Sequence, residues 1–155
     1  MPKPRIIALD VGEKRVGVAV TDPLGLTAQP LTVIPRKPHG QFLESISDLV
    51  RQKEAELVIL GLPRRTDGAI GPEAQRILSL AYELRNRQGL VVDTFDERLT
   101  TAMAHRVFDE AGMNKKDRRE VVDMTAAALI LEGYLAKRSH SPDSLKPGPS
   151  DAGEA

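Results

Sequence analysis

The chain has 155 residues, 41% of them hydrophobic and 28% charged, which suits one globular domain. Its 22 basic and 22 acidic residues cancel, and cysteine is absent, so disulfides, thiolate zinc sites and a cysteine nucleophile are excluded. No apolar run approaches the roughly 20 residues of a membrane span, and the N-terminus lacks the apolar region of a signal peptide, so we expect a cytoplasmic protein with no membrane partner.

Three antiparallel strands are predicted at the start of the chain. Residues 5–10 form an apolar, β-branched run that ends in an acid, and residues 15–21 alternate as the returning strand of a hairpin. After a turn signal at residues 22–25, a third strand fits within residues 27–34.

Helices and strands alternate in the rest of the chain. Apolar spacing predicts the helices, and short apolar runs predict the strands. Pro72 suits a first helical turn, Gly89 suits a helix end, and Asp117 with Glu120 resembles a capping box. The predicted elements are a helix at 40–54, a strand at 57–60, a loop at 61–71, a helix from about 72 to 88, a strand at 90–95, a helix at 99–111 and a helix from about 117 to 138.

This order predicts an α/β fold with a mixed five-stranded sheet, strand order 3-2-1-4-5, and helices on both faces. The domain is expected to span residues 1–138. Residues 139–155 are rich in Ser, Pro and Gly and nearly lack large apolar side chains, which predicts a disordered C-terminal tail. Ligands of such sheets bind beyond the carboxyl ends of the parallel strands.

Asp10 ends the first predicted strand beside a glycine turn, where a carboxylate is open to a ligand. An alternative interpretation is an aspartate that hydrogen-bonds its own turn. The same segment also resembles the first phosphate loop of actin-like kinases, although those enzymes need two such domains and this chain is long enough for one.

Glu97 and Asp123 are the other candidate acids. Glu97 follows the fifth predicted strand, where an acid could equally favour the dipole of the next helix. Asp123 shares a helix face with Ala126, Ala127 and Ile130, which places it on the face packed against the sheet. A buried carboxylate needs a partner, which could be a divalent cation or an arginine.

In the predicted strand order, the first and fifth strands are two spacings, or about 9.6 Å, apart. Asp10, Glu97 and Asp123 could therefore meet around two metal ions that clamp a phosphoryl displacement. Gly61, between them, has no side chain to block that space. Because the three histidines show no ligand spacing, we expect a hard ion, Mg²⁺ or Mn²⁺, held by carboxylates.

Basic residues gather in the segments next to this predicted site, where a nucleic-acid backbone would pass. Such clusters are also common on solvated surfaces. The candidate nucleic-acid-binding residues are Lys14, Arg15, Arg64, Arg65, Arg98, Lys115, Lys116, Arg118 and Arg119.

Four motifs together resemble the YqgF (also RuvX) family of bacterial ribonuclease H-like proteins. The resemblance implies a ribonuclease H-like fold, a Mg²⁺ or Mn²⁺ site, and catalytic, metal-binding carboxylates at Asp10, Glu97 and Asp123. Many resolvases of the wider superfamily carry further acids where this chain has Gly61 and Ala126. The matching segments are ALDVGEKRVGVAVTD (8–22), VILGLPRRTDGAIGPEA (58–74), DERLTT (96–101) and VVDMTAAALILEGYL (121–135).

The resulting prediction is a hydrolase, a metal-dependent nuclease that cuts phosphodiester bonds during 5′-end maturation of pre-16S ribosomal RNA. One alternative is a Holliday junction resolvase acting on branched DNA as a homodimer. Another is a non-catalytic module that binds RNA or the transcription machinery. The sequence leaves open the choice between RNA and DNA, the cleavage site, the metal and the oligomeric state.

Overall fold

The predicted hairpin is formed by β1 (Arg5–Val11) and β2 (Arg15–Thr21), which pair in antiparallel orientation. The N–H of Gly12 donates to the carbonyl of Arg15 at 2.9 Å and closes the turn. β3 (Ala28–Pro35) continues the antiparallel arrangement beside β2. The computed structural model describes residues 4–63, 71–96 and 115–139.

Two parallel strands complete the sheet. β4 (Ala55–Leu62) lies beside β1, and β5 (Val92–Asp96) lies beside β4. The observed order β3-β2-β1-β4-β5 confirms the predicted order. The carboxyl ends of β1, β4 and β5 therefore meet at one edge of the sheet.

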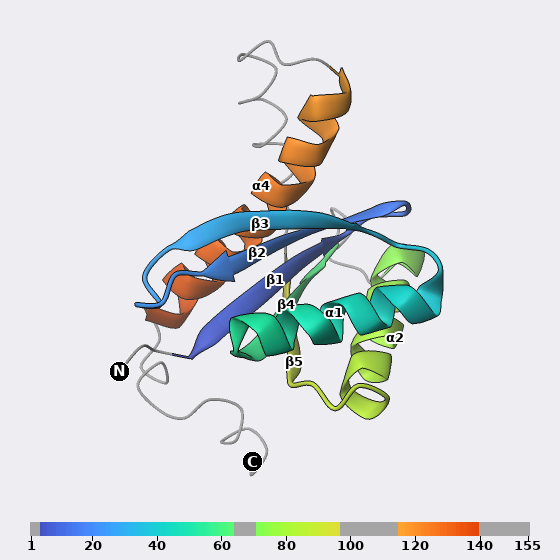
Figure 1. Cartoon of the computed structure of the whole chain (residues 1–155), viewed down its shortest axis with the longest axis horizontal. Coiled ribbons are helices and arrows are strands. Elements are labelled where there is room, and N and C mark those ends of the chain that lie inside the picture. Colours follow the sequence, from blue (N-terminus) through green and yellow to red (C-terminus); the bar gives the residue numbers. More distant parts are fainter. Residues whose placement is uncertain (1–3, 64–70, 97–114, 140–155) are drawn as a thin grey trace.

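The helices cover both faces, as predicted (Figure 1). α1 (His39–Lys53) and α2 (Pro72–Asn86) pack on one face, and α4 (Lys115–Ser139) crosses the other. Side chains of β1 alternate between the two cores: Ile7 and Leu9 lie under α1 and α2, whereas Ile6 and Ala8 lie under α4. No helix in the described ranges is long and apolar enough to cross a membrane.

Several predicted boundaries were wrong by a few residues. β4 continues through Gly61 and Leu62, predicted as loop, because both residues still pair with β5. α2 ends at Asn86, two residues early, and the chain turns through Gly89 at a φ of +69°, where the N–H of Leu90 reaches the carbonyl of Leu84 at 3.1 Å. β5 consequently begins at Val92 rather than at residue 90.

The start of the last helix also differs from the prediction. α4 begins at Lys115, so Asp117 lies inside the helix rather than at its cap. An acid is favoured both as the capping residue and within the first turn, where it interacts with the helix dipole. The presence of Asp117 therefore indicates a nearby helix start but not its exact residue. The helix predicted at 99–111 lies outside the described residues. Of the tail predicted at 139–155, Ser139 is the last residue of α4, and the rest lies outside the described residues.

Candidate active site

Asp10 lies near the carboxyl end of β1 on the face covered by α4. The alternation that sends Ile6 and Ala8 to that face sends Asp10 there also. Its side chain is half-buried. Asp10 therefore points to the side of the sheet on which the last helix lies.

Gly17 brings α4 against Asp10. It is the direct partner of Asp10 across the hairpin, so the two Cα atoms are about 4.5–5.5 Å apart. A Cβ on Gly17 would lie 1.9 Å from the carbonyl oxygen of Asp123, far inside contact distance. The backbone of α4 thus touches β2 at Asp123, one strand away from Asp10.

The side chain of Asp123 has an arginine partner. Nε of Arg15, on β2, donates to Oδ2 of Asp123 at 2.7 Å, although the two residues are 108 positions apart. The side chains are 34% and 21% exposed, respectively. An arginine was one of the two partners considered from the sequence, and Arg15 itself was predicted to bind nucleic acid.

Asp10 and Asp123 suit a hard divalent cation, since both offer carboxylate oxygens from rigid elements on one side of the sheet. The described residues contain no group of three potential ligands. Glu97, the third predicted ligand, lies outside them, directly after Asp96 at the end of β5.

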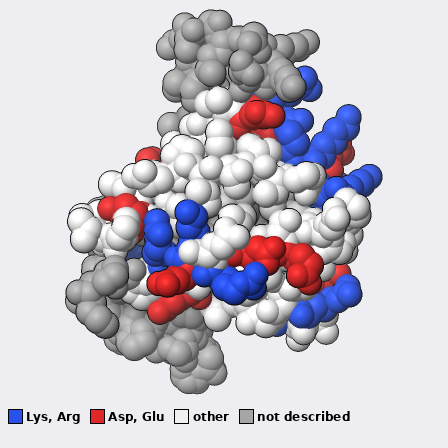
Figure 2. All heavy atoms as spheres, in the orientation of Figure 1, with Lys and Arg blue, Asp and Glu red and all other residues white. Residues whose placement is uncertain are grey.

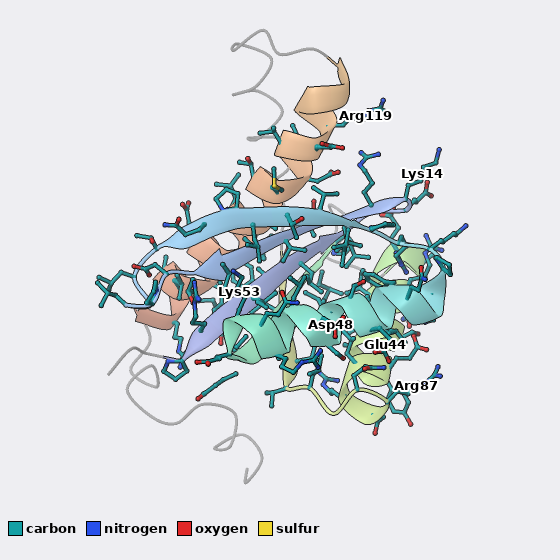
Figure 3. All side chains as sticks on the ribbon, viewed as in Figure 1. Lys14, Glu44, Asp48, Lys53, Arg87 and Arg119 are labelled. Atoms are coloured by element: carbon teal, nitrogen blue, oxygen red, sulfur yellow. The ribbon has the colours of Figure 1, made fainter. Side chains whose placement is uncertain are left out.

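Besides Arg15, the structure describes the side chains of two of the predicted nucleic-acid-binding residues. Lys14 is exposed at the hairpin tip, and Arg119 is exposed on α4 on the same side of the molecule (Figure 3). Lys115, Lys116 and Arg118 lie in α4, but the structure does not describe their side chains, and Arg64, Arg65 and Arg98 lie outside the described residues.

Arg36 is a positioning residue that sequence reasoning missed. The guanidinium of Arg36 donates to the carbonyl of Gly12 at 3.0 Å, and the backbone N–H of Arg36 donates to the carbonyl of Lys14 at 3.0 Å. These bonds tie the end of β3 to the turn that follows Asp10. The sequence held no signal for them, because Arg36 lies 24 residues from Gly12.

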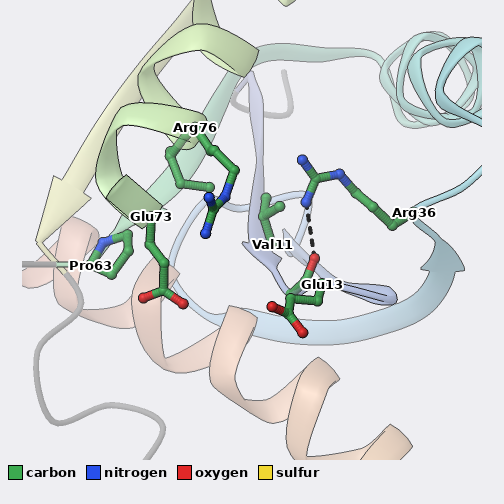
Figure 4. Close-up of a pocket in the computed structure, with 8 residues that line it drawn as sticks. Val11, Glu13, Arg36, Pro63, Glu73 and Arg76 are labelled. Atoms are coloured by element: carbon green, nitrogen blue, oxygen red, sulfur yellow. Dashed lines mark hydrogen bonds between the residues drawn. The ribbon is translucent and has the colours of Figure 1, made fainter. Parts of the chain in front are cut away.

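Arg36 also lines a pocket of about 120 Å³ beside the end of β1 (Figure 4). Arg76 of α2 reaches the same space from the other side, and Glu13 and Glu73 supply two carboxylates. The charges balance, so the pocket has no clear preference for an anion. Because Val11 packs with the core under α1 and α2, the pocket lies across the sheet from Asp10.

The comparison with protein-family models identifies the family of this chain. The family model RuvX, described as Holliday junction resolvase, matches residues 4–137. This chain belongs to the RuvX family. The family predicted from the four motifs is thereby confirmed.

Curated relatives agree with the RuvX assignment. A protein of Moorella thermoacetica named "Putative pre-16S rRNA nuclease" is 47% identical over 131 residues, which cover 84% of this chain and 94% of the relative. A Clostridium novyi protein of the same name is 37% identical, with 84% and 97% covered.

Solved structures show the fold of this RuvX protein. T. thermophilus RuvC in complex with a Holliday junction substrate superposes with a TM-score of 0.56 at 15% identity, covering 90% of this chain and 98% of RuvC. Fowlpox virus resolvase bound to junction DNA gives 0.52 at 14% identity, covering 86% and 97%. These matches confirm the predicted ribonuclease H-like fold class.

Proposed function

We propose that this RuvX protein is a metal-dependent nuclease that hydrolyses phosphodiester bonds in the cytoplasm during 5′-end maturation of pre-16S ribosomal RNA. The observation that supports the proposal is that the backbone of α4 at Asp123 lies against Gly17, the strand partner of Asp10. Two carboxylates on one side of a sheet edge are suited to bind a hard cation. The names of the relatives supply the substrate.

In this proposal, Asp10, Asp123 and Glu97 hold Mg²⁺ or Mn²⁺. When bound, such ions lower the pKa of the attacking water and stabilise the leaving oxygen of the phosphodiester. The carboxylates themselves orient the site. Lys14 and Arg119 are exposed on the same side of the molecule, and in this proposal they contact phosphates of the bound strand.

The test is cleavage by the purified protein of an RNA that spans the 5′ end of the small-subunit rRNA, with Mn²⁺ present. Three variants are each expected to cleave more than about 100-fold more slowly: Asp10→Asn, Asp123→Asn and Glu97→Gln. Mutating a residue that only hydrogen-bonds to a metal ligand already lowers activity about 10–100-fold. Asp48→Asn is the matched control, because this exposed acid of α1 pairs with Arg51 away from the site (Figure 3). Equal cleavage by wild type and Asp10→Asn would reject the proposal.

A second candidate function is Holliday junction resolution. It is favoured by the description of the family model and by the junctions bound in two similarly folded structures. A synthetic four-way junction in the same assay separates the two functions. Resolution requires symmetric cuts by a homodimer, whereas an rRNA nuclease leaves the junction intact.

A further inference from the structure

Arg15 places a positive charge against the carboxylate of Asp123, in the part of the sheet where Asp10 also lies. Its Nε atom contacts Oδ2 of Asp123, and Asp123 lies over Gly17, the strand partner of Asp10. Two acids on neighbouring backbone segments destabilise each other when both carry charge, so a nearby cation stabilises the arrangement. Arg15 supplies that cation from within the chain.

A divalent cation would have to compete with Arg15. The guanidinium hydrogen-bonds Oδ2 of Asp123, so a metal that binds this oxygen must displace it, and the two positive charges repel each other. The Arg15 side chain is also a third exposed and makes its hydrogen bond through Nε alone, among contacts within the described residues. It can therefore leave Asp123 without disrupting the core.

The released guanidinium would lie beside Lys14, at the hairpin that borders the site. A guanidinium matches a phosphate with parallel N–H donors, which makes arginine well suited to a nucleic-acid backbone. The position next to the acids is where a phosphate of the scissile strand must come.

We propose that Arg15 is an exchangeable counter-ion: it neutralises Asp123 in the metal-free protein and passes to a substrate phosphate when a divalent cation takes Asp123. This inference rests on the proposed nuclease function, because it assigns the cation to Asp123. It makes cation binding and nucleic-acid binding mutually favourable, since each removes a competitor of the other.

The first experiment measures Mn²⁺ binding to the full chain by titration calorimetry without nucleic acid. Arg15→Ala and Arg15→Gln are expected to bind Mn²⁺ about 3–10-fold more tightly than wild type, the effect of removing one partly exposed ion pair. Arg15→Lys keeps the charge and is expected to stay within about twofold of wild type. Arg87→Ala is the matched control, since Arg87 pairs with Glu83 on α2, which packs on the opposite face of the sheet from α4.

Three outcomes of the titration are distinguishable. Tighter binding by Arg15→Ala and Arg15→Gln, both with cooperative thermal unfolding, supports the exchange. Unchanged or weaker binding overturns it and makes Arg15 a residue that merely orients Asp123. An absence of Mn²⁺ binding by wild type and all variants overturns the metal site of the proposed function, and the exchange with it.

The second experiment tests the phosphate contact without metal, in EDTA, so that it does not depend on catalysis. Anisotropy of a fluorescein-labelled 20-nucleotide RNA from the 5′ end of the 16S precursor reports binding. Asp123→Asn frees Arg15 and is expected to tighten RNA binding about 3–10-fold relative to wild type. In an Arg15→Ala background the same substitution should change binding less than about twofold. An equal gain in both backgrounds would show that lost negative charge alone is responsible, and would overturn the role of Arg15.

Discussion

The Thr21 hydroxyl adds a hydrogen bond between β1 and β2 just beyond Ile7 and Val20, the last residue pair of the two strands. Thr21 is 1% exposed, and its Oγ1 accepts a hydrogen bond from the N–H of Ile6 at 2.9 Å. Thr21→Val keeps the shape but leaves this buried N–H without that acceptor, so we expect the free energy of unfolding to fall by about 1–3 kcal/mol. Thr21→Ser retains the acceptor and should lose less. Urea denaturation measures both, and equal losses would contradict the role of the hydroxyl.

Tyr134 links stability to alkaline pH. Its half-buried ring meets Phe95 edge-on at a centroid distance of 6.2 Å. Burial raises the pKa of the Tyr134 hydroxyl above its usual value of 10.0, and Asp93 raises this pKa further, whereas Arg138 lowers it. The unfolded chain therefore loses this proton first as the pH rises, and the stabilisation present below pH 10 is lost as the pH passes through the folded-state pKa.

The expected result is a stability curve that falls more steeply above pH 10 for wild type than for Tyr134→Phe. Urea denaturation of both proteins from pH 8 to pH 11 measures the difference. The stability difference between the two proteins should stay constant below pH 9, where the hydroxyl is protonated in both states. Parallel curves over the whole range would show that the Tyr134 pKa is not raised.

At the scale of elements, glycine decides how closely α4 approaches the sheet. A Cβ on Gly17 would meet the helix backbone at Asp123, and the backbone cannot move aside cheaply. A Cβ on Gly133 would meet the ring of Phe95 at 2.9 Å, and a ring at the sheet edge can shift. Gly40, in α1, has open space around its Cβ position. The three sites therefore form a graded series of obstacles to one added methyl group.

We expect Gly17→Ala to lower the free energy of unfolding by about 3 kcal/mol or more, the upper range for overpacking. Gly133→Ala should lose about 1 kcal/mol. Gly40→Ala should gain up to about 1 kcal/mol from helix propensity. Denaturation curves rank the three. Because Gly17→Ala moves Asp123 away from Asp10, it should also weaken Mn²⁺ binding, and a stable variant with normal Mn²⁺ affinity would contradict the close contact.

At the scale of the whole molecule, the net charge is zero, but basic and acidic side chains are unevenly distributed over the surface. Basic side chains gather along the edge that carries the hairpin tip and α4, whereas acids and bases mix over α1 (Figure 2). Lys14 and Arg119 belong to the basic edge, and Lys53 and Arg87 lie away from it (Figure 3). Phosphate contacts release counterions, so the location of a basic residue determines the salt dependence of binding.

Lys14→Ala and Arg119→Ala should each weaken RNA binding and reduce the slope of log affinity against log salt by about 0.7. Lys53→Ala and Arg87→Ala remove the same charge elsewhere and should leave the slope unchanged. Anisotropy titrations between 50 and 200 mM salt, roughly the range over which such contacts are resolved, provide the measurement. Equal slopes for all four variants would mean that the basic edge is not the binding surface.

The amino-acid sequence by itself determined the elements, their order, the fold class and the family. These depend on local features: the alternation of residues 15–21, the helical spacing of residues 40–54, and motifs read in order along the chain. The errors fell at boundaries, such as the start of β5, where pairing with β4 rather than local preference decides which residues join the strand. The disordered tail, the helix at 99–111 and the roles of all the candidate site residues remain predictions from the sequence.

Only the tertiary structure decided which residues meet at the site. That Asp10 faces α4 follows from strand alternation, but that Asp123 lies beside it depends on where the helix crosses the sheet. The sequence left the partner of Asp123 open between an arginine and a cation, and the structure pairs it with Arg15 across 108 residues. Gly17 looked like one more strand residue, although a glycine within a strand can mark a close backbone approach. The periodicity of apolar residues predicts which face of a strand or helix a residue lies on. Which residue it contacts there depends on how segments far apart in the chain pack together.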